Sequence, residues 1–255
     1  MKFDQVKALV TGGASGLGLS VARHIVAGGG KVCLLDINDK AGPVAACELG
    51  NDTCYIHTDV TSEAAVVRAV DESLLANDGL NLVVNCAGVI GAGRVLGREA
   101  PMELSFFTHT IMINLVGSFN VAKAAADRMQ HNDPGLDGER GLIINTASVA
   151  AWEGQIGQAA YSASKSGIVG MTLPMAREFS RIGIRVVTIA PGIFWTPMVD
   201  GMPEQVQQSL AASIPFPSRL GKPEEFAAMV QHITENVYLN GTTIRLDGAV
   251  RLAPK

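Results

Sequence analysis

The sequence has no cluster of lysines or arginines and no long uninterrupted apolar stretch. Its 20 Lys and Arg residues are spread among 24 Asp and Glu residues, and the formal net charge is −4. Proteins that bind nucleic acid or an anionic membrane usually carry a concentrated basic patch, so neither partner is expected. No apolar run reaches the ~18 residues needed to span a bilayer. Because the first residues lead directly into an apolar strand, no signal or transit peptide is expected either.

Cysteine is scarce and irregularly spaced. The four cysteines, Cys33, Cys47, Cys54 and Cys86, form no CxxC pair and no Cys/His ligand spacing. This excludes the usual zinc and dithiol motifs, and no metal site is expected. Three of the four lie in apolar, strand-like contexts. We therefore expect reduced, buried thiols and a cytoplasmic protein.

What the sequence has in abundance is apolar residues and glycine. Hydrophobic types make up 47% of the 255 residues and charged types 17%, which is enough apolar surface for a continuous core. Short apolar runs alternate with amphipathic stretches, without a linker or a short repeat. This pattern predicts one α/β domain over 1–255, a doubly wound Rossmann-type fold whose seven-stranded parallel sheet has helices on both faces. Residues 1–140 are expected to form mainly the cofactor half, and residues 141–255 the catalytic and substrate half.

The expected elements follow from the apolar periodicity. Strands are predicted at 6–11, 31–36, 53–57, 81–88, 142–145, 184–190 and 242–248. Helices are predicted at 17–27, 40–49, 62–76, 104–131, 161–182, 203–213 and 221–234. The helix at 161–182 contains Pro174, which is expected to kink or break it.

A glycine-rich turn follows the first expected strand. The segment TGGASGLG (11–18) lies between an apolar run and an amphipathic helix, which is the context that a dinucleotide-binding turn requires. Gly12 and Gly16 would let the backbone turn tightly and approach a pyrophosphate, and Gly18 would let the helix pack against the strand. The amino end of the helix would offer N–H groups to the phosphates. An ordinary flexible turn is the alternative.

The second expected strand ends in an acidic residue. Asp36 stands eighteen residues after Gly18, near the spacing at which a carboxylate accepts hydrogen bonds from the adenosine ribose. Its charge would also repel a 2′-phosphate. Ile37 follows instead of a cation, and Ser15 fills the turn position where a cation could sit. The pattern predicts NAD rather than NADP, and a helix cap is the alternative role for Asp36.

Polar and small residues also stand at the ends of the next two strands. Asp59 and Val60 follow the third strand; Asp59 could reach the adenine amino group or cap helix 62–76, and the two roles can coexist. Cys86, Ala87 and Gly88 end the fourth strand. Small residues at this point would let a flat ribose or adenine lie against the backbone.

Asn114 lies inside an apolar stretch of helix 104–131. A buried amide costs free energy unless it is hydrogen-bonded. Asn114 is therefore expected to hold a backbone carbonyl or a water near the reacting centre, or to make a structural hydrogen bond alone.

Residues 141–165 bring three further polar groups to one place. Ser148 lies at the end of a buried strand, and Tyr161 and Lys165 are four residues apart on the following helix, hence on one face. A hydroxyl, a phenol and an ammonium would converge at the carboxyl end of a strand, where open α/β sheets bind ligands. We interpret this as a proton-transfer site. Because YxxxK is common, an incidental surface Tyr and Lys is the alternative.

Taken in order, these motifs resemble the short-chain dehydrogenase/reductase superfamily over nearly the entire chain. The motifs are TGGASGLG, NCAG at 85–88, Asn114, Ser148, Tyr161-x-x-x-Lys165 and Pro191–Gly192. The segments INTASVAAWEGQIGQAAYSASKSGIVGMTLPMAR, FPSRLG and LNGTTIRLDGA resemble more closely the branch of type II 3-hydroxyacyl-CoA dehydrogenases, also called 17-beta-hydroxysteroid dehydrogenase type 10. The chain departs from that branch at 89–110 and 198–213, where a substrate loop and a lid would lie. These departures put the substrate in doubt.

The resemblance implies specific roles for individual residues. Tyr161 would be the catalytic base, Lys165 and the positive nicotinamide ring would lower its pKa, Ser148 would hold the substrate oxygen, and Asn114 would fix a water that links Lys165 to solvent. The implied NAD contacts are Gly12, Ser15, Gly16, Leu17, Gly18, Asp36, Asp59, Val60, Cys86, Ala87, Gly88, Tyr161, Lys165, Pro191, Gly192, Phe194 and Thr196. The implied substrate contacts are Ser148, Gln155, Gln158 and Tyr161.

The predicted function is reversible, NAD-dependent oxidation of a secondary hydroxyl to a ketone, with a 3-hydroxyacyl-CoA of fatty acid metabolism as the substrate. Arg94 and Arg98 could meet CoA phosphates, or could be solvated loop arginines. One alternative is an NAD-dependent alcohol or hydroxysteroid dehydrogenase of broad range; another, of a different class, is a scaffold subunit that only holds NAD. The family also implies a homotetramer built through helices 104–131 and 161–182 and the last strand, although the sequence leaves a dimer open.

Overall fold

The computed structural model describes residues 1–201 and 203–254, and within them seven parallel strands form one sheet. The strands lie in the order β3-β2-β1-β4-β5-β6-β7. Their bounds are β1 (Lys7–Thr11), β2 (Lys31–Asp36), β3 (Thr53–His57), β4 (Leu82–Asn85), β5 (Gly141–Thr146), β6 (Ile184–Pro191) and β7 (Thr243–Leu246). The predicted seven-stranded parallel sheet is therefore confirmed.

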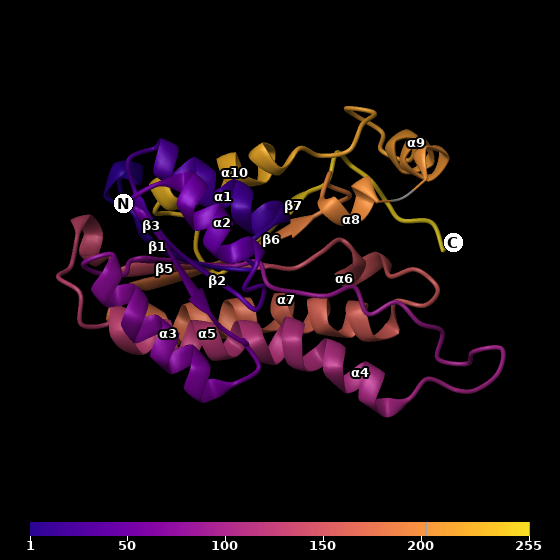
Figure 1. Cartoon of the computed structure of the whole chain (residues 1–255), viewed down its shortest axis with the longest axis horizontal. Helices are drawn as coiled ribbons and strands as arrows, with labels where there is room; N and C mark the ends of the chain where they lie inside the picture. The colour runs from indigo at the N-terminus through magenta and orange to yellow at the C-terminus, as the bar shows by residue number, and fades with distance from the viewer. Residues whose placement is uncertain (202, 255) are drawn as a thin grey trace.

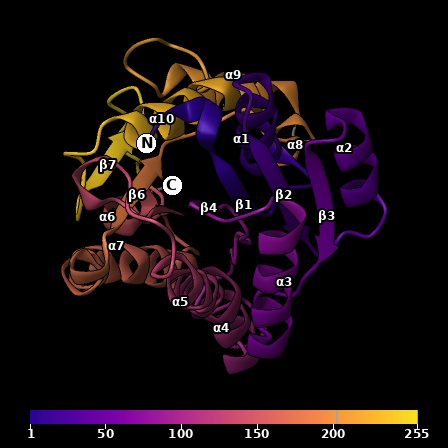
Figure 2. The same ribbon diagram turned by 90° about the vertical axis from the view of Figure 1, so that its left-hand side faces the viewer.

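Helices cover both faces of the sheet, as predicted. One face carries α1 (Gly16–Ala27), α2 (Ala41–Leu49) and α10 (Pro223–Glu235), and the other carries α3 (Glu63–Ala76), α5 (Gly117–Met129) and α7 (Ala159–Phe179) (Figures 1 and 2). Successive strand residues point to opposite faces. In β1, Ala8 and Val10 accordingly join the apolar cluster of the first face, and Leu9 joins the cluster of the second. Both faces of the central strands are buried, which explains their uninterrupted apolar runs.

The strand order reverses between β1 and β4, which places a crevice at their carboxyl ends. β1 leads outward to β2 and β3 on one side, and β4 leads to β5, β6 and β7 on the other. The last residues of the central strands lie in register, with Thr11 beside Asn85 and Asn85 beside Asn145. The short helices α6 (Ala150–Glu153), α8 (Pro197–Asp200) and α9 (Glu204–Ala212) gather at this same end of the molecule, on the right of Figure 1.

The helix predicted over 104–131 is interrupted by a wider turn. It consists of α4 (Leu104–Ile111), a five-residue π-helical segment, η2 (Met112–Val116), and α5. Asn114 lies inside η2. The other departures are smaller: α7 runs through Pro174 as one helix, and short 3-10 turns occur as η1 (Phe3–Gln5), η3 (Leu136–Gly138) and η4 (Ser180–Ile182).

The expectation of four reduced cysteines is wrong for one pair. Cys33 in β2 and Cys54 in β3 form a disulfide, with their Cα atoms 4.7 Å apart. The cause is the register of the two strands, which sets these residues directly side by side. Cys47 is a free, exposed cysteine and Cys86 a free, partly buried one. The disulfide removes the cysteine-based argument for a cytoplasmic protein.

One helical run, Leu104–Met129, is long and apolar enough to cross a membrane by length and composition alone. Polar residues interrupt this run, so it does not appear in the sequence as an unbroken apolar stretch. In the fold, one side of this run packs on the sheet through buried residues of α5 such as Val121, Ala122 and Met129. The apolar composition of this run therefore reflects packing within the domain. Other apolar residues of the same run are exposed.

Candidate active site

A cleft of about 510 Å³ lies at the carboxyl ends of β1, β2 and β4, where the strand order reverses. Its volume is within the range of small-molecule and cofactor sites, roughly 300–1,000 Å³. The sequence-predicted residues that line it are Gly12, Ser15, Gly16, Leu17, Gly18, Asp36, Asp59, Val60, Cys86, Ala87, Gly88 and Thr196. Predicted residues from five separate segments of the chain thus meet at one end of the sheet.

Close backbone contacts explain the glycines of the turn. A Cβ atom on Gly18 would stand 2.3 Å from the carbonyl oxygen of Gly12, so only glycine lets α1 pack so near to β1. Gly12 packs against the backbone of Ala87, and a Cβ there would stand 2.8 Å from the Ala87 nitrogen. Gly16 has a φ of +54° and no neighbour nearer than 3.9 Å to a Cβ built on it. Of the three, Gly16 is the one that opens onto free space at the amino end of α1.

Asp36 fixes the glycine turn from the end of β2. One carboxylate oxygen accepts the N–H of Ala14 at 3.1 Å, and the other accepts the N–H of Asn38 at 3.0 Å. The alternative role as a cap for α2 is wrong, because Asn38 instead accepts the N–H groups of Lys40 and Ala41. The Asp36 carboxylate also lines the cleft.

Asp59 lines the cleft but does not cap α3. Its carboxylate accepts the N–H and the hydroxyl of Thr61, at 2.9 and 2.8 Å. The cap is Ser62, whose hydroxyl oxygen accepts the N–H of Ala65 at 3.3 Å. The cap proposed for Asp59 is therefore wrong.

The turn after β4 is held by a hydroxyl that sequence reasoning missed. The Thr11 oxygen accepts the N–H groups of both Cys86 and Ala87, each at 3.1 Å. Thr11 is a polar residue at the end of an apolar strand, and this position could have indicated its role in the sequence. Burial raises the pKa of the Cys86 thiol to about 11, so this cysteine faces the cleft as a neutral thiol.

Ser148, Tyr161 and Lys165 converge beside the end of β5, as predicted from their spacing. Lys165 is 5% exposed, and its ammonium donates to the Thr146 carbonyl at 2.8 Å. The same ammonium nitrogen lies 5.8 Å from the centre of the Tyr161 ring. Ser148 is buried, and its hydroxyl hydrogen-bonds with Tyr161. A hydroxyl, a phenol and an ammonium therefore form one connected group.

Burial favours the neutral forms of both Tyr161 and Lys165. It raises the pKa of Tyr161, against which the hydrogen bond with Ser148 acts. Burial also lowers the pKa of Lys165 to about 8, with the nearby Cys86 acting in the opposite direction. In the protein without cofactor, burial outweighs the Ser148 hydrogen bond, so the pKa of Tyr161 is raised and not lowered as expected. The pair is suited to proton exchange, because neither charged form is strongly solvated.

Asn114 clamps the backbone of Val89, one of the cleft-lining residues. Its side-chain oxygen accepts the Val89 N–H at 2.8 Å, and its side-chain nitrogen donates to the Val89 carbonyl and the Ser164 hydroxyl, both at 3.0 Å. The residue is fully buried. The wider turn of η2 is a feature that often marks functional sites. Of the roles considered for Asn114, the structure displays the hold on a backbone carbonyl.

Several other predicted residues lie away from the cleft lining. The Phe194 ring packs edge-on against Phe226 in the core, with the ring centres 6.3 Å apart. Pro191 ends β6, and its carbonyl accepts the N–H of Val149. Gly192 stands so near Asp247 that a Cβ would come within 2.9 Å of it.

The two glutamines predicted to contact substrate hold loop structure. The Gln158 side-chain oxygen accepts the N–H of Gln155 at 3.0 Å. Gln155 in turn donates through its side chain to the Ala253 carbonyl at 3.0 Å. Both amides are thus committed to the loop before α7 and to the C-terminal segment.

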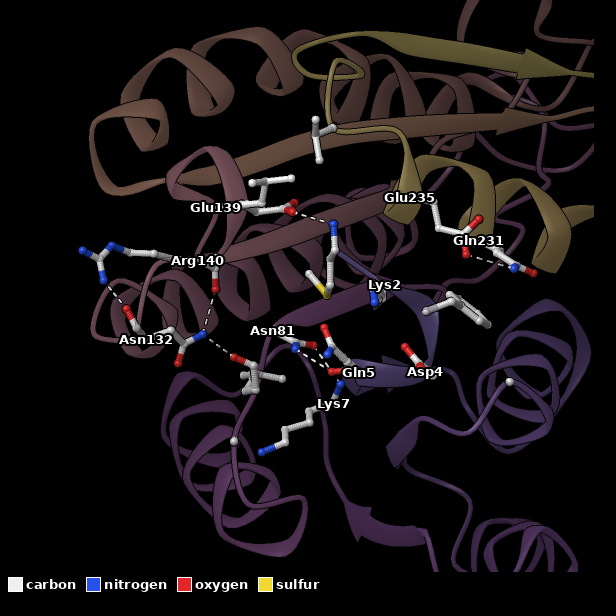
Figure 3. Close-up of a pocket in the computed structure, with 18 of the residues that line it drawn as sticks. Lys2, Asp4, Gln5, Lys7, Asn81, Asn132, Glu139, Arg140, Gln231 and Glu235 are labelled. Carbon is white, nitrogen blue, oxygen red and sulfur yellow. Dashed lines mark hydrogen bonds and ion pairs between the residues drawn. The ribbon is translucent and has the colours of Figure 1, made fainter.

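A larger cavity, of about 1180 Å³, lies at the opposite end of the sheet, around the first residues of β1 and the segments before β4 and β5 (Figure 3). Some of its polar groups pair with one another: the side chain of Asn81 accepts the Lys7 N–H, and Asn132 donates to the Arg140 carbonyl. Size alone therefore does not identify the site. Among residues 1–201 and 203–254, no group of three or more His, Cys, Asp or Glu side chains is arranged to hold a metal ion.

The whole chain is similar to known dehydrogenases. Residues 6–207 match the short chain dehydrogenase family. Human 3-hydroxyacyl-CoA dehydrogenase type-2 is 50% identical over 249 residues, which cover 97% of this chain and 95% of the human protein. The protein of the same name from Drosophila melanogaster is 50% identical over 249 residues, covering 97% of this chain and 98% of its own length.

The fold of this chain is also similar to that of a solved dehydrogenase structure. The crystal structure of 3-hydroxyacyl-CoA dehydrogenase type-2 from Mycobacterium avium gives a TM-score of 0.95 at 42% identity, and the match covers 99% of this chain and 98% of that chain. Together with the Ser148, Tyr161 and Lys165 group, these matches identify the protein as a member of the short chain dehydrogenase family, an oxidoreductase that acts on CH–OH groups with a nicotinamide cofactor.

Proposed function

We propose that this protein catalyses the reversible NAD-dependent oxidation of a 3-hydroxyacyl-CoA to a 3-oxoacyl-CoA. The observation that carries the chemistry is the convergence of Ser148, Tyr161 and Lys165. The group lies beside the cleft, because a Cβ on the cleft-lining Gly88 would stand 3.6 Å from the Lys165 ammonium nitrogen. The choice of substrate is supported by the 50% identity, over 97% of the chain, to relatives that carry this activity in their names.

The cleft fits a dinucleotide. Gly16 leaves open space at the amino end of α1, where backbone N–H groups suit a pyrophosphate. Ser15 is exposed at the same point. Ala87 and Gly88 offer a flat, small-residue wall at the end of β4. Those family-implied cofactor contacts that line the cleft are thus compatible with its shape.

The charges around the cleft favour NAD over NADP. Asp36 and Asp59 both line it, and among the described lining residues there is no Lys or Arg. A 2′-phosphate carries up to two negative charges and would have no cation to pair with at this site. Its approach to the Asp36 carboxylate would be repulsive. This supports NAD as the cofactor.

The chain's own residues supply the proton chemistry. When bound, the nicotinamide cofactor accepts a hydride ion from the carbinol carbon and contributes a positively charged ring. Tyr161 accepts the hydroxyl proton through its phenolate oxygen, and Ser148 donates a hydrogen bond to the substrate oxygen. We propose that the Lys165 ammonium, 5.8 Å from the ring centre, stabilises the phenolate together with the positive ring of the bound cofactor. Even for an unshifted phenol of pKa ~10, ionisation at about pH 8 requires about 2.7 kcal/mol of such stabilisation, and the burial of Tyr161 adds to this cost.

An exposed apolar face supports a homotetramer. Phe106, Met112 and Phe119 lie on α4, η2 and α5 and are 40%, 39% and 47% exposed, and Leu173 on α7 is 43% exposed. Large apolar side chains that stay exposed on neighbouring helices favour a protein–protein interface there. β7 is the edge strand of the sheet and offers a second contact surface. Sedimentation equilibrium is expected to give four chains per particle; a monomer at micromolar concentration would contradict the proposal.

A substrate panel tests the proposed activity. The purified protein is assayed with NAD and 3-hydroxyacyl-CoAs of several chain lengths, hydroxysteroids and simple secondary alcohols, and NADH formation is followed by absorbance. We expect kcat/KM for the best acyl-CoA to exceed that for simple alcohols by about 100-fold, because binding of the CoA moiety contributes to transition-state stabilisation. A steroid or alcohol as the best substrate would contradict the proposal, and tight NAD binding without any turnover would favour a scaffold role.

A further inference from the structure

A network of ion pairs lies behind the catalytic group and joins α6 to β7. Glu153, the last residue of α6, receives both terminal nitrogens of Arg245, at 2.9 and 3.3 Å. Arg245 also pairs with Asp247 at 2.7 Å, and its guanidinium lies 5.3 Å from the centre of the Trp152 ring. The side chains of Glu153, Arg245 and Asp247 are 19%, 25% and 10% exposed. The pairs are therefore much less screened by solvent than surface ion pairs are.

Glu153 lies in the segment that carries two catalytic groups at its ends. Ser148 precedes α6, and its hydroxyl oxygen accepts the Ala150 N–H at 3.1 Å at the first turn of that helix. Tyr161 lies in the first turn of α7. The position of α6 therefore affects the distance between the Ser148 hydroxyl and the Tyr161 phenol.

The same segment is tied to the C-terminal residues of the chain. Glu153 accepts the Leu252 N–H at 3.3 Å, and the Ile156 N–H donates to the Pro254 carbonyl at 3.0 Å. Glu153 is thus the point at which α6, β7 and the C-terminal segment meet.

The network also reaches the backbone on the other side of Ser148. Asp247 packs against Gly192, and the carbonyl of the neighbouring Pro191 accepts the Val149 N–H at 3.1 Å. Ser148 therefore lies between two backbone segments that the Arg245 side chain connects. Removing the Glu153 charge leaves Arg245 paired with Asp247 alone, which breaks the ionic link between α6 and β7.

Resting on the proposed function, we infer that Glu153 and Arg245 are positioning residues that fix the Ser148 hydroxyl relative to the Tyr161 phenol. They do not contact the reacting atoms; they act through α6. Arg245 suits this task because its planar fork binds both carboxylate oxygens at once, which a lysine cannot do.

The test compares Glu153→Gln, which keeps the shape of the side chain and removes its charge, with Arg245→Lys, which keeps the charge and removes the fork. Both variants are expected to lower kcat about tenfold, since small displacements of catalytic groups have effects of this size, while NAD affinity stays as in the wild type.

The second readout needs no substrate: the ionisation of Tyr161 is followed in the free protein by tyrosinate absorbance, with a Tyr161→Phe background to subtract Tyr55 and Tyr238. Because the Ser148 hydrogen bond lowers the Tyr161 pKa, its displacement should raise that pKa in both variants. The other titratable groups near Tyr161 or its partner, Lys165 and Cys86, are unchanged in these variants.

A matched control exists at the opposite end of the same sheet. Glu139 and Arg185 form a buried ion pair at 2.7 Å, with side chains 9% and 8% exposed. Glu139→Gln should lower the melting temperature without changing kcat or the Tyr161 pKa. Wild-type kcat and an unshifted Tyr161 pKa in Glu153→Gln would overturn the inference, as would equal losses of rate in Glu139→Gln. An inactive wild-type protein would contradict the proposed function. The inference could still be tested, because the tyrosinate titration of Tyr161 needs no substrate.

Discussion

Replacing Tyr161 with phenylalanine is expected to lower kcat by about 10³-fold, the scale of general acid–base catalysis. The substitution removes the phenol hydroxyl that is proposed to accept the substrate proton and leaves the ring in place. Lys165 keeps its bond to the Thr146 carbonyl, and Tyr161 is not among the residues that line the cleft. NAD affinity, measured by protein fluorescence, should therefore stay close to the wild-type value.

Tyr238→Phe is the matched control for Tyr161→Phe. Tyr238 is 97% exposed, and it lines a separate cavity formed by residues 137–139, 180–185 and 237–240 rather than the cleft. The same chemical change there should leave kcat unaltered. Turnover near the wild-type rate in Tyr161→Phe would remove Tyr161 from the mechanism.

Replacing Asp36 with alanine is expected to change the ratio of kcat/KM for NAD to that for NADP by about 100-fold in favour of NADP. Loss of a charged hydrogen-bond acceptor costs roughly 1.5–3 kcal/mol with NAD, and loss of the negative charge removes the repulsion of a 2′-phosphate. The measurement is kcat/KM with each cofactor at a fixed, saturating concentration of the alcohol substrate.

Two substitutions can separate the effect of the Asp36 charge from its structural role. The carboxylate also accepts the Ala14 and Asn38 N–H groups, so Asp36→Ala loosens the glycine turn as well. Asp36→Asn keeps one acceptor oxygen and removes the charge. If repulsion sets the preference, Asn shifts the ratio nearly as far as Ala with a smaller loss of stability. A wild-type protein that prefers NADP would refute the assignment.

The sequence predicted the catalytic end of the sheet because parallel strands bring their carboxyl ends to one edge. Asp36, Cys86 and Ser148 each follow an apolar run, and one helical turn relates Tyr161 to Lys165. These relations depend only on strand ends and helical periodicity. Both can be read from a single sequence.

Features that depend on register between distant segments were not predictable in this way. The Cys33–Cys54 disulfide requires the offset between β2 and β3, which apolar runs do not encode. Arg245 meets Glu153 only because β7 lies beside β6 at the edge of the sheet. The sequence shows neither partner as special.

The sequence also could not show which of several similar residues takes a given structural role. Asp59 and Ser62 are both good cap residues, and the loop geometry gives the cap to Ser62. The π-helical turn that holds Asn114 changes the helical repeat by one residue, which is too small a disturbance to see in the apolar pattern. Phe194 was given a cofactor contact by position in the family, while its ring is part of the core.

The pH dependence of kcat in both reaction directions, measured for the wild type and for Tyr161→Phe, tests the central claim most directly. If Tyr161 is the base, alcohol oxidation falls about tenfold per pH unit below its apparent pKa, because the protonated phenol cannot accept the proton. Ketone reduction shows the opposite limb and falls above that pKa, because the phenolate has no proton to donate. Both limbs should disappear from the residual activity of Tyr161→Phe. An oxidation rate that does not change with pH, or a limb that persists in the variant, would contradict the account.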